Sequence, residues 1–443
     1  MPGATLAFGE AVSRMISALG LLKERRFLPL FVTQFLGAFN DNLFKQAMVL
    51  FATYRVFNDA RVESNFNAIA TGLSLIPFFL LSALSGQLAD TLDKAKIIRW
   101  VKTAEIGIML VGGAGLLIAL DGHTRIGLGV MLATVLLLGV HSTFFGPIKY
   151  AILPQHLDSH HVLGGTGLIE AGTYLSILLG TILAGALSFE QSVIAVLIVA
   201  CFGWVAGRMV PPAPRIGPRL EISHNPVSSS WRLISATMHI PRLFLAICAI
   251  SFFWTIGAVL IILFPPLVKN LLTADEQVAS LVLAIFSIGI AIGSVIVNRL
   301  LDGRISAKFA PASVIAMGMS VVAFSLLART WIQAPGDHLY SIAEFVEQPR
   351  AIPIILSLAA IAITGGMFVV PLYTFLTTTV TKDQTARTVA ANNVVNSGAM
   401  VVGALLVMAL AAIGASPENM LFLAAAMCLV AAWIAQKLHL ACD

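Results

Sequence analysis

The chain has 443 residues, of which 58% are hydrophobic and 11% charged, and its net charge is +5. An average soluble domain carries about 25% charged residues. A soluble protein of this size would have too little polar surface to cover so much apolar side chain. The composition therefore excludes a soluble enzyme, a nucleic-acid-binding protein and a disordered chain. It predicts a helical protein that crosses a membrane many times.

Twelve apolar stretches are long enough to span the hydrocarbon core, which takes about 20 residues of helix. In chain order they cover residues 28–54, 66–89, 96–120, 126–150, 162–187, 190–210, 242–267, 277–300, 309–332, 351–377, 387–413 and 417–438. We therefore expect an all-α membrane protein with twelve transmembrane helices in two pseudo-symmetric halves of six. The divisions that we expect are an N-terminal lead at 1–27, the two halves at 28–210 and 242–438, a linker at 211–241 and a tail at 439–443.

The linker is rich in proline, with Pro211, Pro212 and Pro214 at its start. Near its end, Trp231, Ile234 and Met238 follow helical spacing. Residues 230–240 therefore form either a short helix on the membrane surface or an ordinary loop.

The distribution of Lys and Arg predicts the orientation. If the N-terminus is cytoplasmic, twenty of the 27 Lys and Arg residues lie on the cytoplasmic side. This count assigns Lys102 to the loop between spans 2 and 3. Cytoplasmic loops carry this excess of positive charge. The N-terminal residues have a charged end and no small-residue cleavage site, so we read them as a cytoplasmic lead and not as a cleaved signal. We expect both termini in the cytoplasm.

Several short motifs stand at specific places in this pattern. Spans 2 and 3 are joined by GQLADTLDKAK, from Gly86 to Lys96, and span 1 contains GAFNDN from Gly37 to Asn42. Span 4 ends in GPIKYAIL, span 5 contains GLIEA around Glu170, and span 10 contains GGMFVVPL. Six plus six spans with the GxLAD motif resemble the major facilitator superfamily. The other motifs resemble the lysophospholipid transporter family within it.

The resemblance implies a function and a place in the cell. Members of the family are similar to flippases that return lysophospholipids, chiefly lysophosphatidylethanolamine, to the cytoplasmic leaflet of the bacterial inner membrane. They work beside, or fused to, an acyltransferase/acyl carrier protein synthetase that reacylates the lipid. On this basis we expect alternating access to a polar cavity, with lysophospholipid and membrane lipids as ligands and no nucleic acid.

Polar residues inside the spans are the candidate substrate contacts, because a charge deep in a bilayer is costly unless it pairs or lines water. Asp41 and Lys45 share one face of span 1, where they either bind a lipid headgroup or form a structural ion pair. The remaining candidates are polar residues of spans 1, 4, 5 and 11: Asn40, Asn42, Lys149, Glu170, Tyr174, Asn392, Asn393 and Asn396. Asparagines in span 11 serve either phosphate binding or helix packing.

A second charged group surrounds the loop between spans 2 and 3. Its members are Asp90, Lys94, Lys96, Arg99 and Glu105. They form either an inner gate or a rigid loop that sets the topology. His141 is either a proton relay or, more commonly, a packing residue. Gly289 and Gly293 form a GxxxG pair, which favours close helix contact over dimerisation.

No catalytic motif and no nucleotide-binding motif occurs in the sequence, so we expect neither an enzyme nor a cofactor. Two other functions remain open. One is a proton-coupled carrier of a drug or organic ion, with Glu170 or Asp41 as the titrating acid. The other is a lipid-sensing anchor for an acyltransferase that transports nothing.

Overall fold

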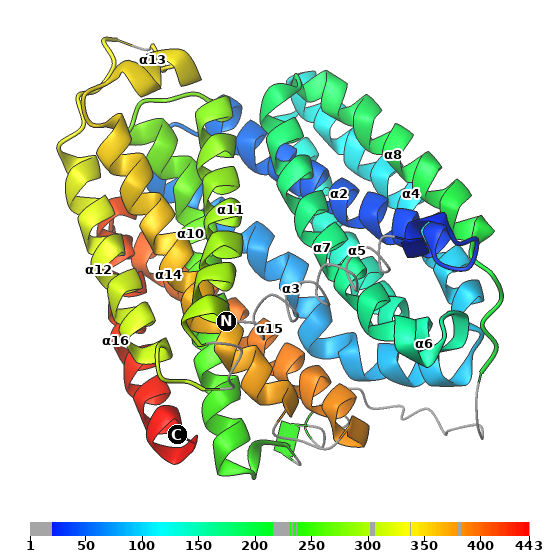
Figure 1. Cartoon of the computed structure of the whole chain (residues 1–443). Helices are drawn as coiled ribbons and strands as arrows, with labels where there is room; N and C mark the ends of the chain where they lie inside the picture. Colours follow the sequence, from blue (N-terminus) through cyan, green and yellow to red (C-terminus); the bar gives the residue numbers. More distant parts are fainter. Residues whose placement is uncertain are drawn as a thin grey trace. The chain divides into compact units, whose positions relative to one another are not determined.

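The computed structural model describes residues 20–215, 231, 234–235, 237–301, 306–336, 338–378 and 382–442 (Figure 1). Nearly all of these residues are helical. The chain divides into two compact units. Unit 1 contains residues up to 46 and residues 81–224, and unit 2 contains residues 47–80 and residues 225–443. Within the predicted surface helix at 230–240 the structure describes residues 231, 234–235 and 237–240, of which 231, 234–235 and 237–238 are helical.

Unit 1 is a bundle in which α4 packs against α5 and α8. Its helices are η1 (Leu21–Lys23), α4 (Lys94–Leu120), α5 (Thr124–Ala151), α6 (Leu153–His156), α7 (Ser159–Ala186) and α8 (Phe189–Met209). The helices α2 (Leu28–Phe51) and α3 (Ala60–Thr91) contribute to both units.

Unit 2 is built around α10, which contacts α11, α14, α15 and α16. Its elements are the π-helical turn η2 (Ala52–Val56), α10 (Pro241–Asn270), α11 (Glu276–Leu300), α12 (Ala310–Arg329), α13 (Ile342–Glu347), α14 (Ala351–Thr378), α15 (Lys382–Ala412) and α16 (Pro417–Cys442). Segment 47–80 belongs to the first six spans by sequence, yet it packs in unit 2. The units therefore divide the chain differently from the two halves expected at 28–210 and 242–438.

Every predicted span coincides with a long helix in the described part of the chain. Ten helices there are long and apolar enough to cross a membrane. The closely spaced spans 5 and 6 are separate helices, as predicted, because Ser188 caps α8 in a reciprocal capping box with Gln191.

A proline inside α5 explains one contact between helices of unit 1. Proline has no N–H, so the carbonyl four residues before it loses its helical donor. Pro147 thus frees the Thr143 carbonyl, which accepts a hydrogen bond from Ser85 Oγ of α3 at 2.8 Å. A carbonyl inside a membrane has no water to bind, so the proline favours a polar side chain on the neighbouring helix.

In unit 2 the helices α11 and α14 approach closely at small residues. A Cβ atom added at Gly293 would lie 1.9 Å from the Ile363 carbonyl oxygen, and one at Gly366 would lie 2.2 Å from the Ile290 carbonyl oxygen. A Cβ at Gly289 would likewise meet the opposite helix. The prediction that the GxxxG pair permits close helix contact is confirmed.

This contact predicts a stability effect. Gly293→Ala should separate α11 from α14 and lower the free energy of unfolding by about 1–3 kcal/mol, the usual range for overpacking. Gly257→Ala in α10 is the matched control, because an added Cβ there meets no atom within 4 Å. Thermal unfolding of the purified protein in detergent measures both. Equal melting temperatures for the two variants would contradict the packing.

Candidate functional site

A buried polar network in unit 1 joins α2, α4 and α5. Its centre is Glu105 of α4, whose side chain is fully enclosed. One carboxylate oxygen, Oε2, accepts a hydrogen bond from Lys102 Nζ one turn earlier, and the other, Oε1, accepts from Asn40 Nδ2 of α2 at 3.1 Å. Nε2 of His141, in α5, lies 3.2 Å from Oε2. Glu105 therefore ties three helices together through charge-assisted contacts.

Glycines make room for the Lys102 side chain. A Cβ added at Gly37 of α2 would lie 2.8 Å from Lys102 Nζ, and Cβ atoms at Gly203 and Gly207 of α8 would lie 3.2 and 3.1 Å from Lys102 atoms. The ammonium group also lies 5.9 Å from the centre of the Phe145 ring. A long charged side chain can be buried here because the backbones of α2 and α8 approach it at three glycines, which have no side chains.

Asp41 lies on the edge of this network and is half-buried. Its Oδ2 accepts a hydrogen bond from Ser142 Oγ of α5, and it interacts electrostatically with His141 and Glu105. Its enclosed Oδ1 has no hydrogen-bond donor among the described residues. Asp41 thus has one enclosed carboxylate oxygen whose hydrogen-bonding capacity is unused within the described part of the chain.

Lys45 follows Asp41 by one turn of α2 and is also half-buried. The two side chains interact electrostatically, but among the described residues Lys45 forms neither an ion pair nor a hydrogen bond. The structural ion pair, one of the two alternatives for these residues, is therefore not formed. Of the two lysines beside the acids, Lys102 is neutralised by Glu105, and Lys45 retains an ammonium group for another anion.

Lys149 belongs to a different contact at the end of α5. Its Nζ donates to Thr173 Oγ1 of α7 at 3.3 Å, and Thr173 Oγ1 lies 2.9 Å from Gln34 Oε1 of α2. The Lys149 ammonium also lies 5.0 Å from the centre of the Tyr150 ring. The Glu170 side chain lies outside the described residues.

The expected inner-gate group is arranged differently from the prediction. Glu105 contacts Lys102, and Lys102 lies buried in α4 and not in the loop where the charge count had placed it. Lys94 Nζ lies 2.9 Å from the Gln155 amide oxygen, and an Arg99 N–H donates to the Val210 carbonyl at 3.3 Å.

The loop itself is fixed by backbone contacts. Asp93 caps α4 by accepting from the Ala95 amide and also accepts from the Ala213 amide. Lys96 is exposed, and the Asp90 side chain lies outside the described residues. These contacts hold the loop against the segment after α8. Glu105 takes no part in them, because it lies about three turns further along α4.

Unit 2 has a polar cluster of its own around Asn396 of α15. Its Oδ1 accepts from Ser251 Oγ of α10 at 2.7 Å, and its Nδ2 lies 3.4 Å from the Tyr373 hydroxyl of α14. Trp254 Nε1 donates to the same hydroxyl at 2.8 Å. Asn392, one turn away, is fully buried, and neither amide atom has a partner among the described residues.

The other candidate residues lie apart from these clusters. Asn42 donates to the Ala38 carbonyl of its own helix at 2.8 Å, so its amide is used locally. Asn393 is exposed, and Tyr174 is 58% exposed.

Sequence reasoning missed Lys102 as a network member and gave His141 only a minor role. One signal was present for the lysine: Lys102 lies inside the apolar stretch 96–120, three residues before Glu105. That spacing places both charges on one helical face. The contribution of His141 required the packing of α5 on α4, which no local pattern encodes.

The fold is that of several membrane transporters of known structure. The structure resembles that of a D-xylose–proton symporter, with a TM-score of 0.68 and 13% identity over 93% of this chain and 98% of the other. It also resembles a bacterial homologue of the iron transporter ferroportin, with a TM-score of 0.65 and 14% identity over 94% and 98% of the two chains.

Sequence relatives agree with the family resemblance. The chain is 24% identical over 383 residues to the lysophospholipid transporter LplT of Cronobacter sakazakii, covering 85% of each chain. It is 26% identical over 365 residues to LplT of Escherichia coli O1:K1, covering 78% of each. No protein-family model matches the chain. These relatives are named as transporters from bacteria, and ten helices of the described residues are able to cross a membrane.

The Lys102–Glu105 pair predicts strong energetic coupling. Glu105→Gln or Lys102→Met alone should each lower the free energy of unfolding by about 3–5 kcal/mol, because the remaining charge stays buried without its partner. The double variant should lose much less than the sum. A double-mutant cycle of unfolding in detergent measures the coupling. Lys96→Gln, an exposed lysine of the same helix, is the control, and strictly additive losses would exclude the ion pair.

Proposed function

We propose that this protein is a lysophospholipid transporter that works by alternating access. The proposal depends chiefly on one observation, the similarity to LplT proteins over about four-fifths of both chains. The half-buried Asp41 and Lys45 support it, because a charge inside a membrane helix requires a partner or a polar ligand.

The spacing of Asp41 and Lys45 suits a zwitterionic headgroup. One helical turn separates the two residues, a rise of about 5–6 Å. Phosphoethanolamine carries a phosphate and an ammonium group joined by two carbons, so one headgroup can span this turn. In the proposal, Lys45 binds the phosphate and Asp41 Oδ1, which has no donor among the described residues, binds the ammonium group. The preference for lysophosphatidylethanolamine follows from this pairing.

The acyl chain places a second demand on the transporter. Removing hydrocarbon from lipid costs about 0.8 kcal/mol for each CH₂ group. A single acyl tail therefore remains in contact with lipid or apolar side chains while its headgroup crosses. We propose a side opening that lets the tail slide through the membrane as the headgroup moves along polar side chains.

Further features of the proposal concern direction and contacts. Both termini face the cytoplasm, and transport runs toward the cytoplasmic leaflet, where an acyltransferase/acyl carrier protein synthetase reacylates the lipid. The other candidate contacts are polar side chains of four helices: Asn40, Lys149, Glu170, Tyr174, Asn392, Asn393 and Asn396. Asn42 is left out of the proposal because its amide binds its own helix. In the proposal, Asp90, Lys94, Lys96, Arg99 and Glu105 belong to the inner gate, and Glu105 also sets the position of α4 on α2.

One observation favours a second candidate, a proton-coupled carrier of a soluble organic ion. His141 lies 3.2 Å from Glu105, a separation across which a proton can be shared. A protonophore that abolishes transport of a soluble organic cation, with no effect of lysophospholipid as a competitor, would favour this candidate over the first.

Uptake by spheroplasts tests the headgroup assignment. Lys45→Gln should reduce uptake of both lysophosphatidylethanolamine and lysophosphatidylglycerol about tenfold or more, because both lipids carry a phosphate. Asp41→Asn should reduce uptake of lysophosphatidylethanolamine by a similar factor and affect lysophosphatidylglycerol much less, because that lipid has no ammonium group.

Asn42→Ala is the matched control in the same turn of α2, since its amide binds its own helix. It should transport both lipids at more than half of the parent rate. Equal loss of both lipids in Asp41→Asn at normal expression would exclude a contact between Asp41 and the ammonium group.

A further inference from the structure

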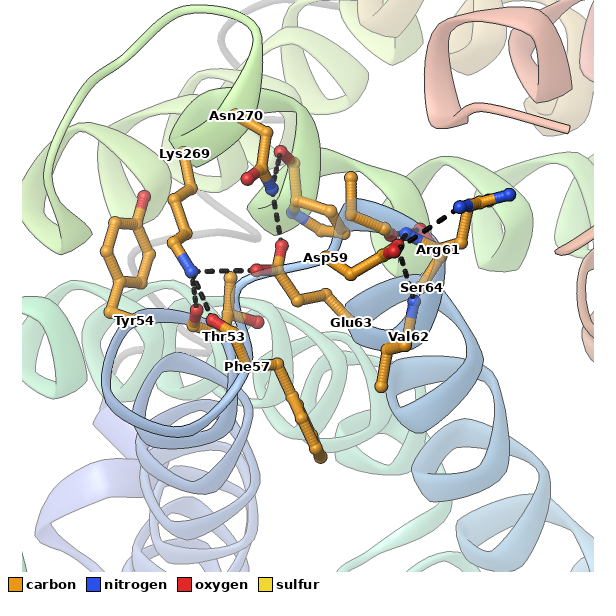
Figure 2. A network of polar contacts seen from close by, with 12 residues as sticks. Thr53, Tyr54, Phe57, Asp59, Arg61, Val62, Glu63, Ser64, Lys269 and Asn270 are labelled. Carbon is orange, nitrogen blue, oxygen red and sulfur yellow. Dashed lines mark hydrogen bonds and ion pairs between the residues drawn. The ribbon is translucent and has the colours of Figure 1, made fainter. Parts of the chain in front are cut away.

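Unit 2 contains a second buried ion pair, formed by Glu63 and Lys269. Glu63, near the start of α3, is fully buried, and Lys269, near the end of α10, is 12% exposed. Their side chains are 2.7 Å apart, although 206 residues separate them in sequence. Figure 2 shows Lys269 reaching toward the turn between α2 and α3. The pair fixes that turn to the end of α10.

All hydrogen-bonding groups of the pair are used. The Lys269 ammonium has three N–H bonds, and it donates to the carbonyls of Thr53 and Phe57 and to Glu63 Oε1. Asn270 Nδ2 donates to Glu63 Oε2, so both oxygens of the carboxylate are bound (Figure 2). We call these five residues the Glu63–Lys269 latch.

The backbone on each side is shaped to receive these groups. In the π-helical turn η2, the Phe57 amide bonds to the Ala52 carbonyl, five residues back. An α-helix would have joined it to the Thr53 carbonyl. The π-turn therefore leaves the Thr53 carbonyl available for Lys269. Such turns are common at functional sites.

On α10 a proline has the corresponding effect. Pro266 has no N–H, so the Ile262 carbonyl lacks its helical donor. Asn67 Nδ2 of α3, one turn after Glu63, donates to this carbonyl at 3.3 Å. Tyr54 adds a third contact, since its hydroxyl lies 3.0 Å from the Ala274 carbonyl oxygen beyond the end of α10.

The latch lies at the end of α10 that is remote from the proline-rich linker. With the proposed cytoplasmic linker, this end faces the outer side of the membrane. A carrier loaded from that side must open there. Segment 47–80 continues helices that carry Asp41 at one end and the GxLAD motif at the other. Release of this segment from α10 is therefore a movement that can be coupled to the substrate site.

We propose that the Glu63–Lys269 latch closes the outer side of the transporter, and that its release from α10 is the step that opens this side to lysophospholipid. The inference rests on the proposed transport function and on the proposed orientation. It concerns access to the site and assigns no substrate contact to the latch.

Labelling of a buried thiol tests the latch without any substrate. Cys201, Cys248, Cys428 and Cys442 are first replaced by Ser, and Thr53→Cys then serves as the reporter, because the Thr53 side chain is fully buried. A membrane-impermeant maleimide is added to spheroplasts. Lys269→Gln and Glu63→Gln should each raise the rate of labelling about tenfold, since each removes an ionic hydrogen bond that holds the turn.

Arg61→Gln is the control from the same turn. Arg61 pairs with Asp59 at 3.4 Å on the exposed surface, outside the latch (Figure 2). The hydrogen bond from the Arg61 backbone amide lowers the pKa of the Asp59 carboxyl, so Asp59 caps α3 as an anion. The Arg61→Gln variant keeps this cap, because the bond uses the backbone and not the side chain of residue 61. Labelling in this variant should match the parent. Parent-like labelling in both latch variants, in protein that elutes as a folded monodisperse species, would overturn the proposal.

Cross-linking is a second test, and it leaves the Glu63–Lys269 ion pair intact. In the cysteine-free background, Tyr54→Cys and Asp275→Cys are joined by a reducible bifunctional thiol reagent. Lysophosphatidylethanolamine uptake should fall to background in the cross-linked protein and return after reduction. Unchanged uptake in fully cross-linked protein contradicts the latch. Absence of uptake before cross-linking contradicts the transport function instead, and leaves the labelling result to decide the latch.

Discussion

The cost of burying a charge in a membrane protein governs the structure of this chain. Lys102 is enclosed in α4, and it is stable there because Glu105 accepts its hydrogen bond and glycines of α2 and α8 leave room for its stem. Since Glu105 also contacts Asn40 and His141, the same pair sets the packing of α2, α4 and α5.

Because a buried charge is costly without a partner, partnered charges can be distinguished from charges that await a ligand. Glu63 and Lys269 have their hydrogen bonds satisfied within the protein, and Lys102 and Glu105 neutralise each other. Asp41 keeps an oxygen without a donor among the described residues, and Lys45 keeps an ammonium group without an anion there. This difference is the physical basis for assigning the headgroup to α2, and for assigning conformational roles to the two buried ion pairs.

The sequence predicts the long helices well, because the hydrocarbon core requires about 20 apolar residues in each span. It also predicts close contact at Gly293, since small residues four apart mark such surfaces. It fails for Lys102, whose burial depends on glycines about one hundred residues later, and for Glu63, whose partner Lys269 is 206 residues away. The twelve-span topology and the cytoplasmic termini stay predictions from charge bias and span length.

Flipping of labelled lipids in proteoliposomes, with the purified protein as the only protein present, tests the transport function most directly. The account predicts rapid movement of lysophosphatidylethanolamine and negligible movement of diacyl phosphatidylethanolamine, because one headgroup site with a single-tail path cannot accept a second acyl chain. Repeating the assay with an imposed proton gradient separates the two candidate functions. Equal rates for the one-tailed and two-tailed lipids, or no movement of either, would contradict the account.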